Sequence, residues 1–155
     1  MKTRASKKIM NGTVKELFSN GSLSVTGRMT GGKRTGLWKY FLRNGQLRAT
    51  GRYAGGLMSG TWKWYRENGK LWQTGTFLKG VKHGPWKRYH LNGKLFDAGR
   101  FTKDEKSGTW KIYDPKGKLL SSVSYRSKVK RDPWKAERHK PRLSRRSVPL
   151  RPKRK

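Results

Sequence analysis

A repeat of 24 residues constrains the fold of this chain more than any other feature of its sequence. Asn-Gly dipeptides recur at this spacing, at positions 20–21, 44–45, 68–69 and 92–93. Tryptophan follows the same period at Trp38, Trp62, Trp86, Trp110 and Trp134. Columns of glycine, leucine and Phe/Tyr share the same phase, without an insertion from position 12 to 134. The chain is therefore predicted to be a tandem array of one structural unit.

Each unit is predicted to be a β-hairpin. Asn-Gly between two alternating segments is the strongest short-range hairpin signal, because both central residues of a type I′ turn need φ > 0. A second turn, such as residues 54–59, joins each hairpin to the next. A two-residue turn at positions 44–45 would give these cross-strand pairs: Leu42 with Leu47, Tyr40 with Ala49, Trp38 with Gly51, and Tyr53 with Gly36.

The predicted pairing separates the two faces of the sheet. The Trp, Leu and Phe/Tyr columns fall on one face, where each large aromatic ring lies opposite a glycine and covers its backbone. We expect this face to be the core. Because a single sheet must cover its apolar face, the long sheet is expected to twist and curl, with the Trp column sheltered inside.

The fold is therefore predicted to be all-β. Residues 12–125 form an elongated, twisted antiparallel sheet of tandem 24-residue β-hairpin repeats, preceded by a basic N-terminal segment over residues 1–11. Residues 126–155 hold fourteen Lys or Arg against two acids, and four of the six prolines. Such a segment buries too little apolar surface to offset its ordering entropy, so a disordered basic C-terminal tail is expected.

The charge of the chain points to its partner. Forty Lys and Arg face eight Asp and Glu, which gives a net charge of +32. A small domain needs a net charge of only about 2–8 for solubility, and a field of this size attracts polyanions. The absence of cysteine excludes disulfides and thiolate metal sites. With no signal peptide or membrane-spanning stretch, a cytoplasmic location is expected, including one within a nucleoprotein particle.

Candidate binding residues lie on the face opposite the Trp column and in the tail. A lysine recurs at the position that follows the Trp column, and successive copies should stand roughly 10 Å apart, two strands per repeat. The candidate polyanion-binding residues are Lys15, Lys39, Lys63, Lys87, Lys111, Lys135, Arg48, Lys70, Lys94, Lys118, Arg142, Arg145 and Arg146. The candidate stacking or partner-binding residues are Phe41, Tyr65, Tyr89, Tyr113, Trp72 and Phe96. Aromatic β-formers also suit a half-buried second face, so a purely structural role for them stays open.

Nothing in the sequence predicts catalysis. The three histidines, His83, His90 and His139, belong to no repeated column, and the acidic residues are scattered among the repeats. No nucleophile–base spacing, phosphate loop or metal-ligand cluster is present. The prediction is a non-enzymatic protein with no catalytic residues, no metal ligands and no cofactor.

The repeat unit resembles a known family. The segment Gly60–Leu71 has the pattern Gly-x-Trp-Lys-x-Tyr-x-x-Asn-Gly-Lys-Leu, which resembles the MORN-type repeat, in particular the bacterial variant found in proteins named as antitoxins. The resemblance covers residues 12–125. It implies an elongated sheet of β-hairpins used as a binding surface for proteins or lipids.

Three kinds of partner agree with these features. The leading hypothesis is a repeat-type binding or scaffold protein that engages nucleic acid, either RNA or a nucleoprotein assembly, because Lys and Arg neutralise phosphates while aromatics stack bases. The second is an antitoxin-like module that neutralises an acidic toxin. The third is an anionic membrane surface, to which each nearby Lys or Arg contributes ~1 kcal/mol. The oligomeric state stays open.

The tail should serve binding rather than folding. Deleting residues 126–155 removes +12 of the +32 charge. We expect a nearly unchanged melting temperature, because the segment has little apolar surface to bury, together with a sharp loss of affinity for a polyanion. Thermal unfolding and binding titrations of the truncated chain measure both quantities. A large loss of stability would show instead that the tail packs on the sheet.

Overall fold

The computed structural model describes residues 10–126, and over this range the chain is built from strands and turns. The predictions for residues 1–9 and 127–155, including the disordered tail, lie outside the described residues. The strands are β1 (Gly12–Leu17), β2 (Leu23–Thr30), β3 (Lys33–Phe41), β4 (Leu47–Ala54), β5 (Leu57–Tyr65), β6 (Leu71–Leu78), β7 (Val81–Tyr89), β8 (Leu95–Thr102), β9 (Glu105–Tyr113) and β10 (Leu119–Tyr125). The predicted all-β class is confirmed.

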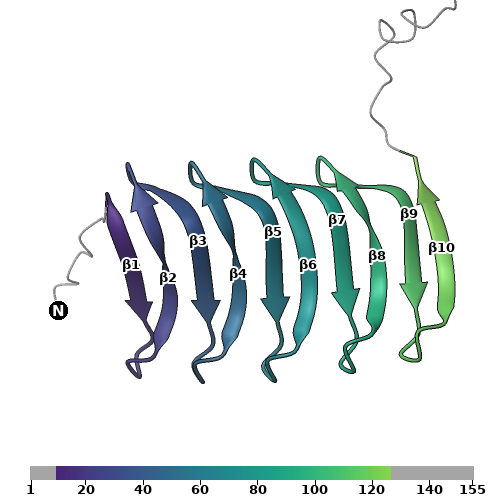
Figure 1. Ribbon diagram of the computed structural model, residues 1–155, viewed down its shortest axis with the longest axis horizontal. Coiled ribbons are helices and arrows are strands. Elements are labelled where there is room, and N and C mark those ends of the chain that lie inside the picture. The colour runs from purple at the N-terminus through teal and green to yellow at the C-terminus, as the bar shows by residue number, and fades with distance from the viewer. Residues whose placement is uncertain (1–9, 127–155) are drawn as a thin grey trace, which may run out of the picture.

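All ten strands form one open antiparallel sheet in the order of the sequence, from β1 to β10. Consecutive hairpins follow one another along a single axis, so the molecule is elongated (Figure 1). The hairpin tips with the Asn-Gly dipeptides lie along one edge of the sheet, and the turns between hairpins lie along the other (Figure 1). The prediction of tandem β-hairpins in an elongated antiparallel sheet is therefore confirmed.

The hairpin tips differ from the predicted two-residue turn. The Leu42 amide donates to the Gln46 carbonyl at 2.8 Å, and the Gly45 amide donates to the Leu42 carbonyl at 2.9 Å. Of the loop residues, only Gly45 has a positive φ, of 81°. The loop is thus three residues long, a type I turn followed by a left-handed glycine. Asn44 contributes through its side chain, whose Oδ1 accepts from the Gln46 amide at 3.0 Å. The predicted type I′ turn is wrong.

This longer loop shifts the pairing near the tips. Trp38 pairs with Gly51 as predicted, but Phe41 pairs with Leu47, and Arg48 becomes the extra residue of a β-bulge. The predicted Leu42–Leu47 pair is therefore wrong. Because a one-residue shift moves a side chain to the other face, the leucine column leaves the Trp face and joins the aromatics of the opposite face. The same pairing recurs in the later repeats as Tyr65 with Leu71, Tyr89 with Leu95, and Tyr113 with Leu119.

Each buried tryptophan covers a glycine. A Cβ added at Gly51 would lie 2.1 Å from Cδ2 of Trp62, so only glycine admits the indole ring at this position. Trp62 pairs with Gly75 across its hairpin, but its ring covers Gly51 of β4 and not Gly75. The prediction that each ring covers the glycine opposite it is therefore wrong. The contact therefore joins successive hairpins. It recurs between Gly27 and Trp38, Gly75 and Trp86, and Gly99 and Trp110.

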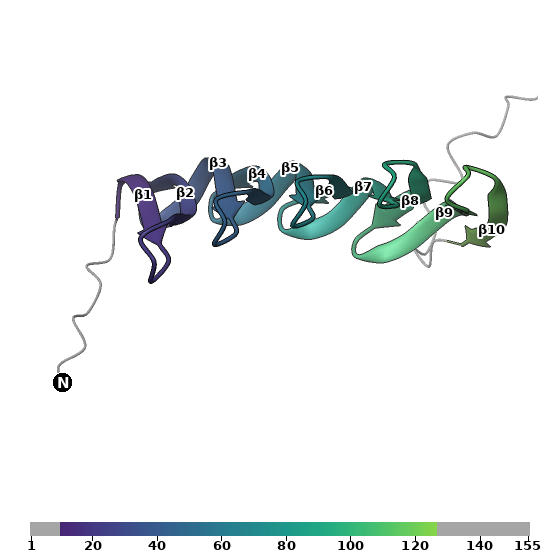
Figure 2. The same cartoon turned by 90° about the horizontal axis from the view of Figure 1, so that it is seen from below.

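The sheet bends where hairpins meet. Thr50 pairs with Lys63 and Arg52 pairs with Ser59. Residues 60–62 of β5 therefore all lie opposite a single residue of β4, Gly51. The surplus residues bend the strand, and Gly60, with φ of 67°, lies among them. Figure 2 shows the resulting curl of the ribbon.

The bend buries the Trp row. Trp38, Trp62, Trp86 and Trp110 are 1–6% exposed, although no second layer covers the sheet within residues 10–126. Their rings are linked through Tyr53, Phe77 and Phe101 at centroid distances of 5.1–6.4 Å. This continuous aromatic row is the core, and the prediction that the curled sheet shelters the Trp column holds for the described residues.

Replacing Gly51 by Ala should destabilise the protein by about 1–3 kcal/mol, because the new methyl group overlaps the Trp62 ring. Trp62→Ala alone should cost about 3–5 kcal/mol. In the double variant the penalty of Gly51→Ala should largely disappear, since the ring it meets is gone. Urea unfolding of the four proteins measures this coupling. Additive losses would show that the ring does not press on Gly51.

Candidate functional site

The predicted lysines form one row across the sheet. Lys39 pairs with Thr50, which pairs with Lys63 on its other side. The same register continues in both directions, so lysine alternates with a small residue on successive strands from β1 to β9. We call this row the lysine ladder: Lys15, Lys39, Lys63, Lys87 and Lys111, separated by Thr26, Thr50, Thr74 and Ala98. All five lysines are exposed, and their strand separation spaces them about 10 Å apart.

Four of the aromatics predicted to bind a partner lie on the same face as the lysine ladder, and only part of each ring is exposed. Phe41, Tyr65, Tyr89 and Tyr113 are half-buried. Each pairs across the strands with a leucine of the same hairpin, as Phe41 does with Leu47. Each ring therefore stabilises its hairpin and leaves part of its surface open to a partner.

Trp72 and Phe96 do not lie beside the ladder. Arg88 follows Trp86 by two residues on β7 and so lies on the Trp face. Its guanidinium lies 5.0 Å from the centre of the Phe96 ring and pairs with Asp97 of β8. The bulge at the hairpin tip turns position 96 toward the Trp face. The placement of Trp72 and Phe96 on the lysine face is therefore wrong.

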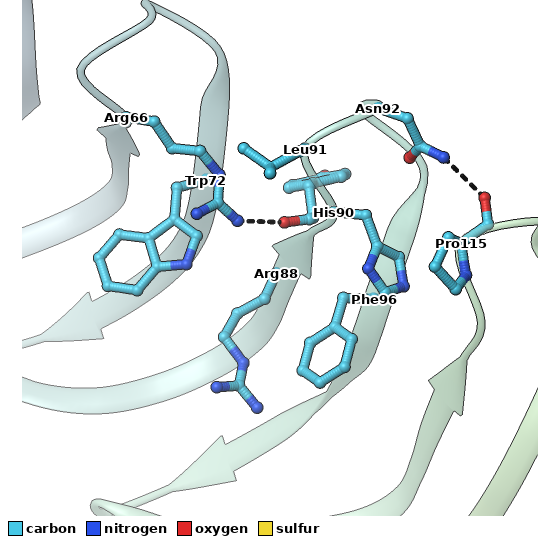
Figure 3. Close-up of a pocket in the computed structure, with 9 residues that line it drawn as sticks. Arg66, Trp72, Arg88, His90, Leu91, Asn92, Phe96 and Pro115 are labelled. Atoms are coloured by element: carbon cyan, nitrogen blue, oxygen red, sulfur yellow. Dashed lines mark hydrogen bonds between the residues drawn. The ribbon is translucent and has the colours of Figure 1, made fainter.

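The two rings instead line a cavity of about 560 Å³, which we call the tip pocket. It lies between the tips of hairpins β5–β6 and β7–β8 and also includes Arg66 and Arg88 (Figure 3). Arg48, at the same repeat position, lines a different cavity together with Ala49 and Trp62, so its placement on the ladder face is also wrong.

The remaining predicted cations fall into two groups. Lys70, Lys94 and Lys118 are exposed at the hairpin tips, and the Lys94 ammonium donates to the Lys116 carbonyl at 2.8 Å. The structure thus separates them from the lysine ladder and gathers them along the edge of the sheet. The tail residues Lys135, Arg142, Arg145 and Arg146 lie outside the described residues.

The Trp face carries cations that the sequence analysis missed. The Arg34 Cζ lies 4.6 Å from the centre of the Trp38 ring, and the Lys106 Nζ lies 4.5 Å from that of Trp110. Lys82 lies over Trp86 in the same manner, at 5.2 Å. The three cations stand at the same position of the repeat, and Met58 occupies this position in the unit between those of Arg34 and Lys82. This recurring position could have indicated cations on the Trp face, but the whole face was assigned to the apolar core.

Two polar groups on the Trp face are tightly partnered. Asp97 is 2% exposed and accepts hydrogen bonds from Arg88, and this bonding raises the pKa of the guanidinium. Arg34 donates to the hydroxyls of Tyr40 and Tyr53 at 3.0 and 3.3 Å. Burial raises the pKa of Tyr40, and its hydrogen bond with Tyr53 raises it further. For Arg34 burial lowers the pKa, but the hydrogen bond with Tyr53 and the attraction to Tyr40, Tyr53 and Glu16 together outweigh burial, so its pKa is raised as well. These cations therefore stay charged, and Tyr40 stays neutral, at physiological pH.

A further cavity, of about 320 Å³, lies on the Trp face and is lined by cations. Lys82, Arg88 and Lys106 line it above the rings of Trp86 and Trp110. Within residues 10–126, no group of three or more His, Asp or Glu is placed to hold a metal ion. The same residues contain no helix long and apolar enough to cross a membrane.

The fold and its repeated side chains define an open-sheet repeat protein whose two faces carry different chemistry. The model of the MORN repeat variant matches residues 34–54, 58–79, 82–99 and 106–127. The chain belongs to this family. The repeats indicate a binding or scaffold role. The curated proteins contain no match to this chain.

Replacing Arg88 and replacing Asp97 should lower the stability of the protein by unequal amounts. Arg88→Met leaves a carboxylate buried without its partner and should cost about 2 kcal/mol, less than for a fully buried pair because the Arg88 side chain is 41% exposed. Asp97→Asn leaves a guanidinium that reaches water, so a loss of about 1 kcal/mol is expected. Urea unfolding at neutral pH compares the two. A larger loss for Asp97→Asn would contradict this account.

Proposed function

We propose that this protein binds single-stranded nucleic acid, RNA foremost, through the lysine ladder. The observation that carries the proposal is the unbroken register of the ladder. Five exposed lysines stand in one row on five successive hairpins, on a face from which the Trp column is absent. A rigid row of cations at regular spacing suits a linear polyanion.

The chemistry of the row favours contacts with the backbone of the nucleic acid. A lysine ammonium is a point charge with three donors on a flexible stem, so it tolerates variable phosphate positions. The threonine hydroxyls between the lysines supply further donors of the kind that contact phosphate and sugar. Such contacts position a strand without reading its sequence, and weak sequence dependence is therefore expected.

An acidic protein is the alternative partner, including the toxin of an antitoxin-like pair. Its support is the cavity in which Lys82, Arg88 and Lys106 converge above Trp86 and Trp110. A folded protein seated there would remove these three cations from water, so one or two alanine substitutions would dominate the loss of affinity.

Changing Lys39, Lys63, Lys87 and Lys111 to Gln should weaken the salt dependence of RNA binding. Each phosphate neutralised on a single strand contributes about −0.7 to the slope of log affinity against log salt. Removing four contacts should make the slope shallower by about three units. The melting temperature should not fall, because the four side chains are exposed and point away from the Trp row. Titrations at several salt concentrations, with RNA and with duplex DNA, measure the slope.

A matched control removes the same charge elsewhere. Four exposed lysines lie in or beside turns at the edges of the sheet: Lys33, Lys79, Lys103 and Lys116. Their change to Gln should alter the slope by about one unit or less. An equal effect of both sets would show that only net charge matters. No binding by the wild-type protein at 100 mM salt would leave the acidic-protein alternative as the better account.

A further inference from the structure

The tip pocket has a composition that the neighbouring repeats do not reproduce. Trp72 and Phe96 occupy the repeat position that holds Arg48 one unit earlier and Leu120 one unit later. Two adjacent hairpins therefore present aromatic rings at the same edge of the sheet, with the side chain of Arg88 extending from the strand between them (Figure 3). The pocket is a local feature of the third and fourth hairpins rather than a property of the repeat.

Hydrogen bonds between successive tips hold the pocket in shape. Arg66 Nη2 donates to the Tyr89 carbonyl at 2.8 Å, and Asn92 Nδ2 donates to the Pro115 carbonyl at 2.7 Å (Figure 3). His90 Nε2 lies 2.9 Å from the carbonyl oxygen of Tyr113, the last residue of β9. Each bond ties a side chain of one hairpin to the backbone of the following hairpin. A cavity organised in this way loses little conformational entropy when a ligand enters.

The pocket offers an open aromatic surface beside an incompletely bonded cation. The Trp72 side chain is 42% exposed, although it is a large hydrophobic group. The guanidinium of Arg66 lies 5.9 Å from the centre of its ring. The Arg66 Nε is buried and has no hydrogen-bond partner within residues 10–126. A ligand with a flat ring would stack on the open face of Trp72, and an adjacent anion would meet the positive charge of Arg66.

We propose that the tip pocket holds one unpaired base of a single-stranded nucleic acid, stacked on Trp72, with a neighbouring phosphate at Arg66. This inference rests on the proposed function. The charge of Arg88 is neutralised by Asp97, so among the described residues Arg66 is the guanidinium of the pocket that has no carboxylate partner. Lys70 and Lys94 lie exposed on the same two tips, where the flanking phosphates would pass.

With a base held in this way, the pocket would let the sheet distinguish single strands from duplexes. Every base has a flat face, so stacking on an aromatic ring tolerates any sequence. A base inside a duplex is already stacked and paired and cannot enter the pocket without being flipped out. The lysine ladder then supplies affinity for any phosphate backbone, and the tip pocket supplies the preference for unpaired strands.

The test compares three ligands: a labelled single-stranded RNA, a strand of the same length with abasic sugars, and a duplex. Trp72→Ala should weaken binding of the RNA about tenfold, the order expected when one base loses its aromatic partner. Binding of the abasic strand and the duplex should not change, since neither places a base on Trp72. Trp72→Phe should keep most of the affinity, and the matched control Leu120→Ala, which changes an exposed residue of the same repeat column, should bind as the wild type does.

Each other outcome overturns the inference. Equal losses for the RNA, the abasic strand and the duplex, or no loss for any of them, would show that Trp72 does not hold a base, while the lysine ladder and the proposed function would stand. Failure of the wild-type protein to bind all three ligands would remove both proposals. Circular dichroism and melting temperature confirm folding of each variant, and Trp72→Phe against Trp72→Leu decides the matter if the alanine variant does not fold.

Discussion

The contact between each tryptophan ring and a bare glycine backbone is the interaction on which the rest of the structure depends. The ring of Trp62 lies where a side chain on Gly51 would have to be. Since Trp62 and Gly51 belong to different hairpins, this contact joins one repeat to the next as well as filling the core. The surplus residues of β5 opposite Gly51 bend the sheet, and the bend buries an aromatic row that one flat layer would leave exposed.

Burial of the Trp row leaves the other face free for charge. The lysines of the ladder stand two strands apart with threonine or alanine between them, so like charges never occupy adjacent strands of that row. Repulsion among them still opposes folding, as it does for any chain with a large net charge. A polyanion on this face would relieve that repulsion, so binding and stability are expected to be coupled through the same side chains. The Trp face manages its cations differently, by placing Arg34, Lys82 and Lys106 over aromatic rings.

Local patterns predicted much of this fold because the same signals recur from one repeat to the next. The hairpin class, the antiparallel order and the pairs Trp38–Gly51 and Tyr40–Ala49 follow from the Asn-Gly positions and the alternation around them. The errors concentrate at the tips. Asn44 can take a left-handed conformation in a two-residue turn or accept a hydrogen bond through its side chain in a three-residue turn, and the dipeptide alone does not distinguish the two. That choice moved Arg48, Trp72 and Phe96 off the lysine face.

The sequence by itself determined the repeat length, the strand class, the column of lysines opposite the tryptophans and the strongly basic character of the chain, because periodicity and composition are properties of the chain alone. Only the tertiary structure decided which glycine each indole covers and which side chains of separate hairpins meet. Arg66, Trp72 and Phe96 come together because the tips of successive hairpins lie side by side and are joined by hydrogen bonds from side chain to backbone. The physical reason is that a bulge of one residue reverses the face of a side chain, and the Asn-Gly dipeptide alone does not distinguish the turn that creates the bulge.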